Sequence, residues 1–138
     1  MELRILLLLS CATKEWLTQD EIFVYDFIVS YGKEFEVCDK NLHGDSSFKF
    51  GEVSLRNSII NEAVKDLVVR NLIVVEADKT KGFFFKISNS GLSYICSFED
   101  DYTEEYKRIA ALAFSKYKNS SENELLNMIH DKAMGKRR

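Results

Sequence analysis

The sequence predicts a mostly helical α+β fold, and three observations indicate it. The pattern Thr18-x-x-Glu21 is a helix-initiation motif that precedes apolar residues at helical spacing. An amphipathic helix follows at 52–70, and two short apolar strands joined by a Gly-containing turn come directly after it, at 72–87. The order helix, loop, helix and β-hairpin predicts a winged-helix-like core at about 18–99, with additional N- and C-terminal helices.

The composition is that of one globular domain. The chain has 138 residues, of which 46% are hydrophobic and 30% are charged, a mixture typical of folded rather than disordered proteins. A chain of this length removes roughly two thirds of its unfolded surface from water, so a core can form without metal ions or disulfides. No repeat, low-complexity segment or interdomain linker interrupts the sequence. Residues 1–138 are therefore predicted to form a single domain.

The first predicted helix, at 3–12, is apolar all round its middle. Its apolar run, Ile5–Leu9, is shorter than the roughly seven to fifteen residues of a secretory signal, and Glu2 stands where such a signal has positive charge. We therefore expect a buried first helix. No other stretch reaches the roughly 18 apolar residues of a membrane span, so no contact with a membrane is expected.

The second predicted helix begins at Thr18 and ends at Gly32. The Thr18 hydroxyl and the Glu21 carboxylate each bind a backbone amide that the first turn leaves unpaired, which fixes the start of the helix. Glycine is a common helix end. Asp26 lies among apolar residues in the middle of this helix. Because a buried carboxylate needs a partner, we expect Asp26 to have a structural role, bonded to an arginine, a hydroxyl or a helix end.

Residues 33–51 are polar and are predicted to form a long loop, with a short extended piece at Phe35–Val37. Cys38 and His43 lie in this loop and superficially resemble a thiol and its base. No third orienting group accompanies them, so we expect that they do not meet. The three cysteines of the chain are widely spaced without a metal-binding pattern, and they are expected to be reduced thiols of a cytoplasmic protein.

The helix at 52–70 has the strongest amphipathic pattern in the chain, with apolar residues on one face and polar residues on the other. Asn71 is predicted to cap its C-terminus. Two strands follow, at 72–77 and 83–87, and the glycine in the short turn between them makes a β-hairpin the expected structure.

Further helices are predicted after the hairpin. Asn89 or Ser90 caps one that continues to about Phe98. Two C-terminal helices occupy 101–133, and a polar break at 119–121 separates them and caps the second.

The common motifs of catalytic and cofactor-binding sites are missing from the sequence. It has no phosphate-binding Gly-x-x-x-x-Gly-Lys loop, no His-Glu-x-x-His metal motif and no Gly-x-Ser-x-Gly nucleophile motif. We therefore predict a protein that is not an enzyme, that has no catalytic residue, cofactor or metal ion, and that acts by binding partners.

Winged helices often bind DNA, so the charge of the predicted recognition helix and hairpin is informative. Over 52–86, six basic and five acidic residues leave a net charge of +1, whereas a duplex-binding protein gains affinity by neutralising several phosphates. We therefore expect direct binding of DNA to be weak. The candidate nucleic-acid contacts are basic residues of this segment and of the C-terminus: Arg56, Lys65, Lys79, Lys81, Lys136, Arg137 and Arg138.

Candidate partner-contacting residues lie on the first helix and on the helix that begins near 101. A helix that is apolar all round must be covered on every side, and part of that cover can come from another chain. The helix that begins near 101 has a stripe of aromatic residues. These residues, like the apolar residues of the first helix, can belong to the core or to an interface. The residues are Leu3, Leu6, Leu7, Tyr102, Tyr106, Phe114 and Tyr117, and together they favour a homo-oligomer or a stable complex with other proteins.

Several segments of the chain follow the pattern of a known family. An apolar first helix precedes a helix with an Asp in its middle, a segment similar to Ser-Leu-His-Pro follows, and then come a helix and the start of a wing. The segments are Arg4–Ser10, Ile22–Ile28, Asn41–Gly44, Phe50–Val53 with Arg56, and Leu67–Ile73. Over most of residues 3–96 the chain thus resembles the middle components of the ABC-three-component systems. Gly44 stands where the family has proline, so no family role is carried over to His43.

The resemblance implies a small subunit encoded between an SMC-like ATPase and an effector, as in Lamassu-type anti-phage defence. In such a system the ATPase binds nucleotide and senses DNA ends, and a nuclease-like effector cuts nucleic acid. This chain would join or regulate them, and it would meet DNA indirectly, through the complex. The alternative function is that of a dimeric winged-helix transcriptional regulator that binds DNA itself.

Overall fold

The computed structural model describes residues 1–42, 50–80 and 82–133 and gives the protein a mostly helical α+β fold. Within these residues the chain forms six helices and one three-stranded antiparallel sheet. In chain order the elements are α1 (Glu2–Cys11), β1 (Leu17–Thr18), α2 (Gln19–Ser30), α3 (Phe50–Val69), β2 (Ile73–Asp78), β3 (Gly82–Ile87), α4 (Asn89–Ile95), α5 (Asp101–Lys116) and α6 (Glu122–Ala133).

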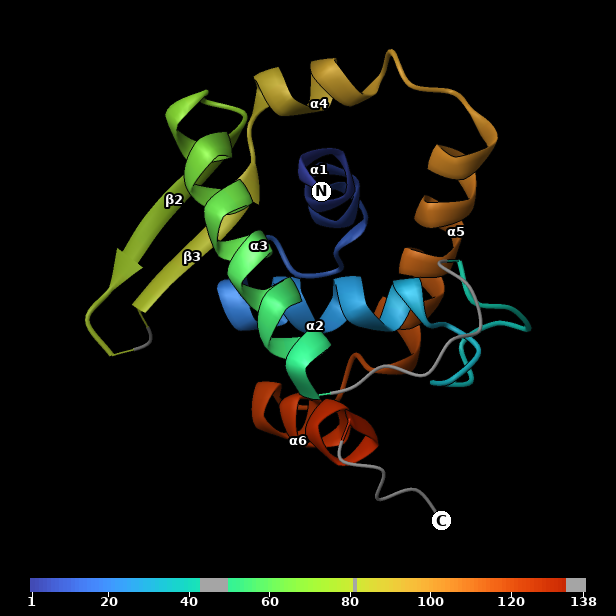
Figure 1. Cartoon of the computed structure of the whole chain (residues 1–138). Helices are drawn as coiled ribbons and strands as arrows, with labels where there is room; N and C mark the ends of the chain where they lie inside the picture. Colours follow the sequence, from blue (N-terminus) through green and yellow to red (C-terminus); the bar gives the residue numbers. More distant parts are fainter. Residues whose placement is uncertain (43–49, 81, 134–138) are drawn as a thin grey trace.

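Helix α1 occupies the centre of the molecule, where Figure 1 shows it end-on with the other helices around it. It contacts α2, α3, α4 and α5, and its residues Ile5–Leu9 are buried. This position follows from the sequence, because a helix that is apolar all round must be covered all round. The prediction of a buried first helix is confirmed.

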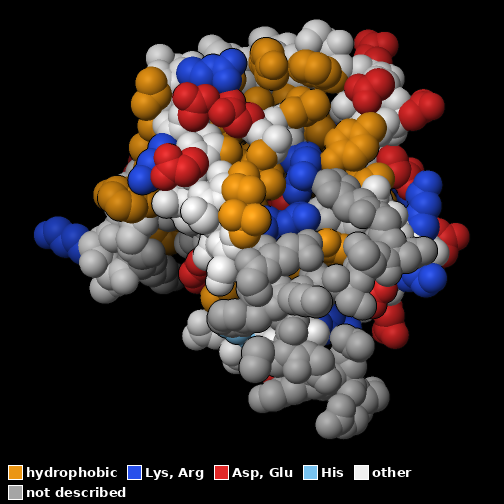
Figure 2. Space-filling model, viewed as in Figure 1, with side chains coloured by type: hydrophobic (Ala, Val, Ile, Leu, Met, Phe, Trp, Pro, Cys, Tyr) orange, Lys and Arg blue, Asp and Glu red, His pale blue; other side chains and the backbone are white. Residues whose placement is uncertain are grey.

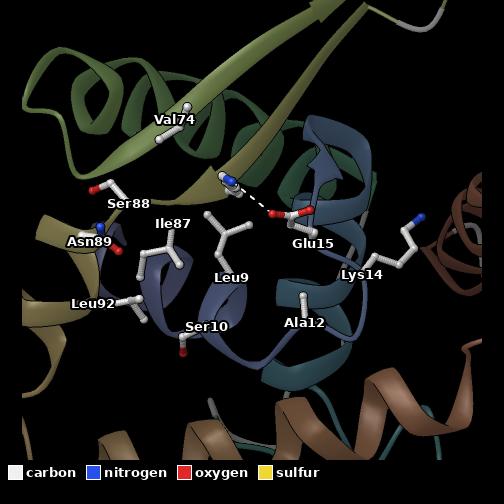
Figure 3. A pocket seen from close by; sticks show the side chains of 11 residues that line it. Leu9, Ser10, Ala12, Lys14, Glu15, Val74, Ile87, Ser88, Asn89 and Leu92 are labelled. Atoms are coloured by element: carbon white, nitrogen blue, oxygen red, sulfur yellow. Dashed lines mark hydrogen bonds and ion pairs between the residues drawn. The ribbon is translucent and has the colours of Figure 1, made fainter.

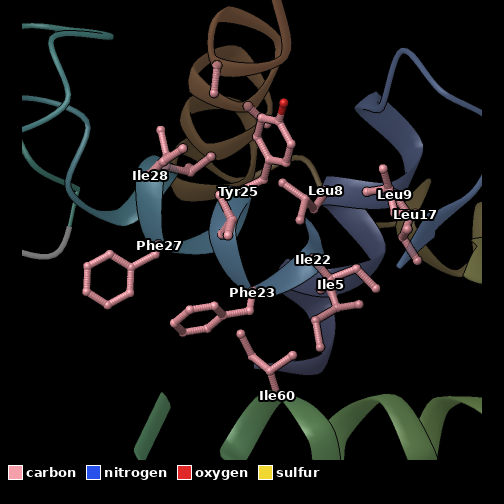
Figure 4. Close-up of a cluster of buried hydrophobic side chains, with 14 of the residues drawn as sticks. Ile5, Leu8, Leu9, Leu17, Ile22, Phe23, Tyr25, Phe27, Ile28 and Ile60 are labelled. Atoms are coloured by element: carbon pink, nitrogen blue, oxygen red, sulfur yellow. The ribbon is translucent and has the colours of Figure 1, made fainter. Parts of the chain in front are cut away.

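Helix α2 lies against α1 and is buried along most of its length. The predicted capping box fixes its start: the Glu21 amide donates to Thr18 Oγ1 at 3.1 Å, and the Thr18 amide donates to Glu21 Oε1 at 3.0 Å. Figure 4 shows side chains of α1 and α2 meeting Ile60 of α3 in the core. The helix ends at Ser30 rather than at Gly32, because Tyr31 already leaves helical geometry.

The segment that follows α2 corrects the prediction of an extended piece at Phe35–Val37. Residues 31–36 form consecutive turns, in which the Glu36 amide donates to the Lys33 carbonyl at 3.1 Å and the Val37 amide donates to the Gly32 carbonyl at 2.8 Å. These local bonds pair backbone groups that a strand would have to pair across a sheet, so the chain turns instead. His43, which was predicted to lie in the same loop, is outside the described residues.

Helix α3 begins at Phe50, slightly before the predicted 52–70 range, and ends at Val69, with Asn71 following as the predicted cap. Asn71 has a positive φ of 62°. Its amide donates to the Val68 carbonyl and the Leu72 amide donates to the Leu67 carbonyl, each at 3.0 Å. This pair of bonds is a Schellman motif, which uses a left-handed residue to pair the last carbonyls of a helix.

The predicted hairpin is formed by β2 and β3, and a strand that the sequence did not reveal completes the sheet. The strand order is β1-β3-β2, with Leu17 opposite Phe85 on one side and Val75 opposite Phe85 on the other. Residues 13–17 lie between the first two predicted helices, and no strand was predicted there. A strand of two residues has no alternation of its own, so the pattern of side chains could not indicate it.

The helices after the hairpin match the prediction with adjusted ends. Ser88 caps α4, since its Oγ accepts the Gly91 amide at 3.0 Å, so the expected caps Asn89 and Ser90 lie inside the helix. The helix ends at Ile95 rather than near Phe98. Helices α5 and α6 occupy the predicted C-terminal range, with a break between them.

Candidate functional site

A buried carboxylate is the most heavily bonded side chain of the described structure. Asp26, in the middle of α2, is fully buried. Arg4 of α1 donates from Nε to its Oδ1 at 3.0 Å and from Nη2 to its Oδ2. Arg56 of α3 donates from Nη1 to Oδ2 at 3.2 Å, and the Tyr106 hydroxyl of α5 donates to Oδ1 at 2.6 Å. One carboxylate thus joins four helices. The expectation that Asp26 is bonded to an arginine, a hydroxyl or a helix end is confirmed, with two arginines and a hydroxyl as the partners.

Ser30 completes this group, which we call the Asp26 cluster (Arg4, Asp26, Ser30, Arg56 and Tyr106), and two aromatic rings lie against it. Ser30 Oγ accepts from Arg56 Nη1 at 2.9 Å and donates to the Asp26 backbone carbonyl at 2.9 Å. The Arg56 guanidinium also lies over the rings of Phe27 and Tyr31, at 5.1 and 5.6 Å from their centroids. These cation–π contacts add to the hydrogen bonds that hold the guanidinium in place.

The charges of the cluster do not cancel. Asp26 carries one negative charge, while Arg4 and Arg56 carry one positive charge each, so the cluster has a net charge of +1. Burial alone acts to raise the pKa of Asp26, but the two guanidiniums and the Tyr106 hydroxyl outweigh it and hold that pKa below its ordinary value. Burial and the adjacent carboxylate raise the pKa of Tyr106 well above its ordinary value. Tyr106 is therefore a hydrogen-bond donor to Asp26 rather than an acid or base near neutral pH.

The lowered pKa of Asp26 predicts how stability depends on pH. A carboxyl with a lower pKa in the folded than in the unfolded chain stabilises the fold fully above its unfolded pKa, and this contribution is lost as the pH falls through the folded pKa. We expect the difference in unfolding free energy between the wild type and Asp26→Asn to be constant above about pH 5 and to shrink below about pH 4. Urea denaturation of both proteins across this range measures it. A difference that grows towards acid pH would contradict the assignment.

Sequence reasoning found Asp26 but not all of its partners. Arg4 received no role, although a single arginine in an otherwise apolar helix is a signal of the same kind as an aspartate in an apolar helix. Arg56 was predicted as a nucleic-acid contact. Its guanidinium instead points inward, to Asp26 and Ser30, with 12% of the side chain exposed.

The other predicted nucleic-acid contacts are scattered. Lys65 lies on the outer side of α3, 3.6 Å from Glu62. Lys79 is exposed in the turn of the hairpin. Lys81 and residues 136–138, the remaining predicted nucleic-acid contacts, lie outside the described residues. The described part of the chain therefore does not gather these cations into one patch.

The predicted partner-contacting residues fall into two groups. Leu6, Leu7, Tyr106 and Phe114 are buried within the chain itself, and Phe114 stacks on Tyr25 with ring centroids 4.2 Å apart. The second group reaches the surface: Leu3, Tyr102 and Tyr117 are half-buried or exposed. A partner can contact the second group directly, whereas the first group supports the fold from inside.

An open cavity of about 600 Å³ lies where the end of α1 meets the hairpin and α4 (Figure 3). Apolar side chains from each element line it, among them Leu9, Val74 and Leu92. Its charged side chains include Lys86 and Glu15, which bind one another at 3.0 Å. Because Glu15 is already paired with Lys86, these two side chains do not form an evident pair of catalytic groups. The lining instead offers a surface for packing.

The described residues contain no group of three His, Cys, Asp or Glu side chains that could hold a metal ion. Cys38, which the sequence placed near His43, donates from its Sγ to the Lys40 carbonyl at 3.0 Å. Across residues 1–42, 50–80 and 82–133, none of the helices has the length and apolar character needed to cross a membrane.

The fold and the Asp26 cluster describe a small α+β protein whose most elaborate polar site holds helices together. Compared with known families, the chain matches the ABC-three component (ABC-3C) system Middle Component 2 over residues 1–137, and it belongs to this family. Its partners accordingly lie within a multi-component system. No curated protein and no solved structure matches the chain.

Proposed function

We propose that this protein is a non-catalytic accessory subunit that joins an SMC-like ATPase to an effector in a Lamassu-type anti-phage defence complex. Membership of the middle-component family over residues 1–137 is the observation that carries this proposal. A middle component is defined by the proteins that accompany it, so its function is assembly with them. In this complex the ATPase and the effector perform the chemistry, and this subunit positions one against the other.

A winged-helix architecture is part of this proposal, and the order of the elements supports it. A helix and a short strand precede the helix pair α2 and α3, and the hairpin of β2 and β3 follows. The short strand β1 returns to pair with β3, so the sheet has the order β1-β3-β2. In this arrangement α3 is the recognition helix and the hairpin is the wing.

The charges around α3 and the hairpin favour a protein partner over direct binding of DNA. Arg70 binds Glu2 at 2.6 Å, Lys86 binds Glu15 at 3.0 Å and Lys65 lies 3.6 Å from Glu62. Positive charges that already have acidic neighbours gain little from phosphates. Exposed apolar side chains stand beside them, including Val69, Val74 and Phe83. Apolar groups of this kind contribute to protein interfaces.

A tagged pull-down from native cells, followed by mass spectrometry, tests the proposal. We expect a large ATPase and a nuclease-like protein to accompany the tagged subunit at fixed ratios. Recovery of the subunit with itself and chromosomal DNA, but without those proteins, would contradict the proposal and would favour a dimeric winged-helix regulator. The element order favours that second function as well, because winged helices with this order include DNA-binding proteins.

A further inference from the structure

One face of the molecule combines exposed apolar side chains with the edge of the Asp26 cluster. On α3, Leu55 is 62% exposed and Ile59 is 44% exposed. These two residues are four apart and therefore neighbours on one side of the helix, and Ile59 is one turn from Arg56. Figure 2 shows hydrophobic side chains over α3 on this face, with basic side chains beside them.

Tyr102 of α5 belongs to the same face. It is 37% exposed, and its ring centroid lies 6.2 Å from that of Tyr106, which binds Asp26. Burial raises the pKa of Tyr102, and the charges of Arg4, Asp26 and Arg56 also act on it, so it lies close to the cluster. We call the surface formed by Arg4, Leu55, Arg56, Ile59 and Tyr102 the α3–α5 face.

The mostly buried part of the α3–α5 face, formed by Arg4 and Arg56, is positively charged. The side chains of Arg4 and Arg56 are 15% and 12% exposed, so they approach the surface without being solvated freely. They share the single charge of Asp26, which leaves one positive charge in excess. Two acidic residues of the neighbouring helices pair with other cations, since Glu2 of α1 binds Arg70 and Glu105 of α5 binds Arg108. A charge in such a partly dry site attracts an opposite charge more strongly than one in open water.

We propose that the α3–α5 face binds an apolar segment of a partner protein that carries a carboxylate, and that this carboxylate pairs with Arg4 and Arg56. Leu55, Ile59 and Tyr102 receive the apolar side chains of the segment and exclude water from the ion pair. This inference rests on the proposed function, because it locates the surface through which the subunit holds one of its partners.

Charge and polarity select this occupant over a nucleic acid. A phosphate backbone stays hydrated and binds through several exposed cations. On this face the two cations, Arg4 and Arg56, are mostly buried and lie beside exposed apolar side chains. The Asp or Glu of an apolar segment instead brings one negative charge, while the apolar side chains around it cover Leu55, Ile59 and Tyr102. An arginine can also pair with a carboxylate through two of its donors, and the bonds of Arg56 to Asp26 and Ser30 both use its Nη1.

The experiment compares two double variants in the tagged complex purified from native cells. Leu55→Glu with Ile59→Glu places two negative charges on the exposed part of the α3–α5 face. Tyr94→Glu with Leu112→Glu adds the same charge at exposed apolar positions elsewhere, on α4 and α5. We expect the first variant to reduce recovery of one partner by about tenfold or more, and the control to recover it like the wild type. Equal thermal midpoints of the variants and the wild type check that the chain still folds.

The outcomes separate the two proposals. If the wild type recovers partners and the Leu55→Glu, Ile59→Glu variant recovers them equally well, the α3–α5 face is not the binding surface and the proposed function stands. If the wild type recovers no protein partner, both proposals fail. If the first variant loses DNA rather than a protein, the occupant is a nucleic acid and this inference is overturned.

The carboxylate is tested by photo-cross-linking from position 59. A photoreactive residue in place of Ile59 is expected to capture a partner peptide that has an Asp or Glu beside apolar residues. Changing that acid to its amide in the partner should weaken the complex about thirtyfold or more, the effect expected when one partner of a buried charge pair is removed. A captured peptide without an acid, or an amide variant that binds like the wild type, would overturn the pairing with Arg4 and Arg56.

Discussion

Replacing Asp26 with alanine is expected to lower the free energy of unfolding by about 3–5 kcal/mol, the usual cost of removing one partner from a buried ionic group. Two guanidiniums and the Tyr106 hydroxyl would remain beneath the surface without the carboxylate that they bind. The thermal midpoint should fall by roughly 10 °C or more for a chain of this length. Urea denaturation and thermal melting of the purified protein measure both effects.

Asp131→Ala provides a control for the Asp26 variant. Asp131 is exposed on α6, and a change at such a position should alter the free energy of unfolding by less than about 0.5 kcal/mol. If Asp26→Ala costs as little as this control, the bonds of the Asp26 cluster do not contribute to stability as the geometry indicates. A large cost would support the interpretation that one carboxylate fixes how α1, α2, α3 and α5 meet.

The sequence predicted the elements whose signals are local. The capping box of Thr18 and Glu21, the cap at Asn71 and the glycine of the hairpin each depend on a few neighbouring residues. Their geometry follows from rules of backbone hydrogen bonding that hold in any fold. The helices and the hairpin were therefore predicted nearly in place, with errors of a few residues at their ends.

What the sequence did not reveal depends on distant contacts. Strand β1 exists because Leu17 and Thr18 pair with β3, far along the chain. The partners of Asp26 come from three other helices, so the sequence predicted that Asp26 needs an arginine, a hydroxyl or a helix end but did not identify Arg4 or Tyr106. Pairings of this kind follow from packing in three dimensions, which local patterns do not encode.

The all-apolar first helix left open whether its leucines face the core or a partner. A sequence of apolar residues on every side requires cover on every side, but it does not say which chain provides the cover. The structure covers α1 with α2, α3, α4 and α5 of the same chain. The aromatic stripe of α5 divides in the same way, since Tyr106 and Phe114 are buried while Tyr102 reaches the surface.

Leu7→Ala distinguishes these two interpretations of α1. Leu7 is fully buried within the chain, so its truncation leaves a cavity and should lower the free energy of unfolding of the isolated protein by about 2–5 kcal/mol. Leu112→Ala, at an exposed position of α5, should cost far less. If Leu7→Ala instead left the isolated chain as stable as the wild type and weakened only its complex, Leu7 would face a partner. Chemical denaturation of both variants, combined with recovery of partners, separates a leucine that supports the fold from one that supports the assembly.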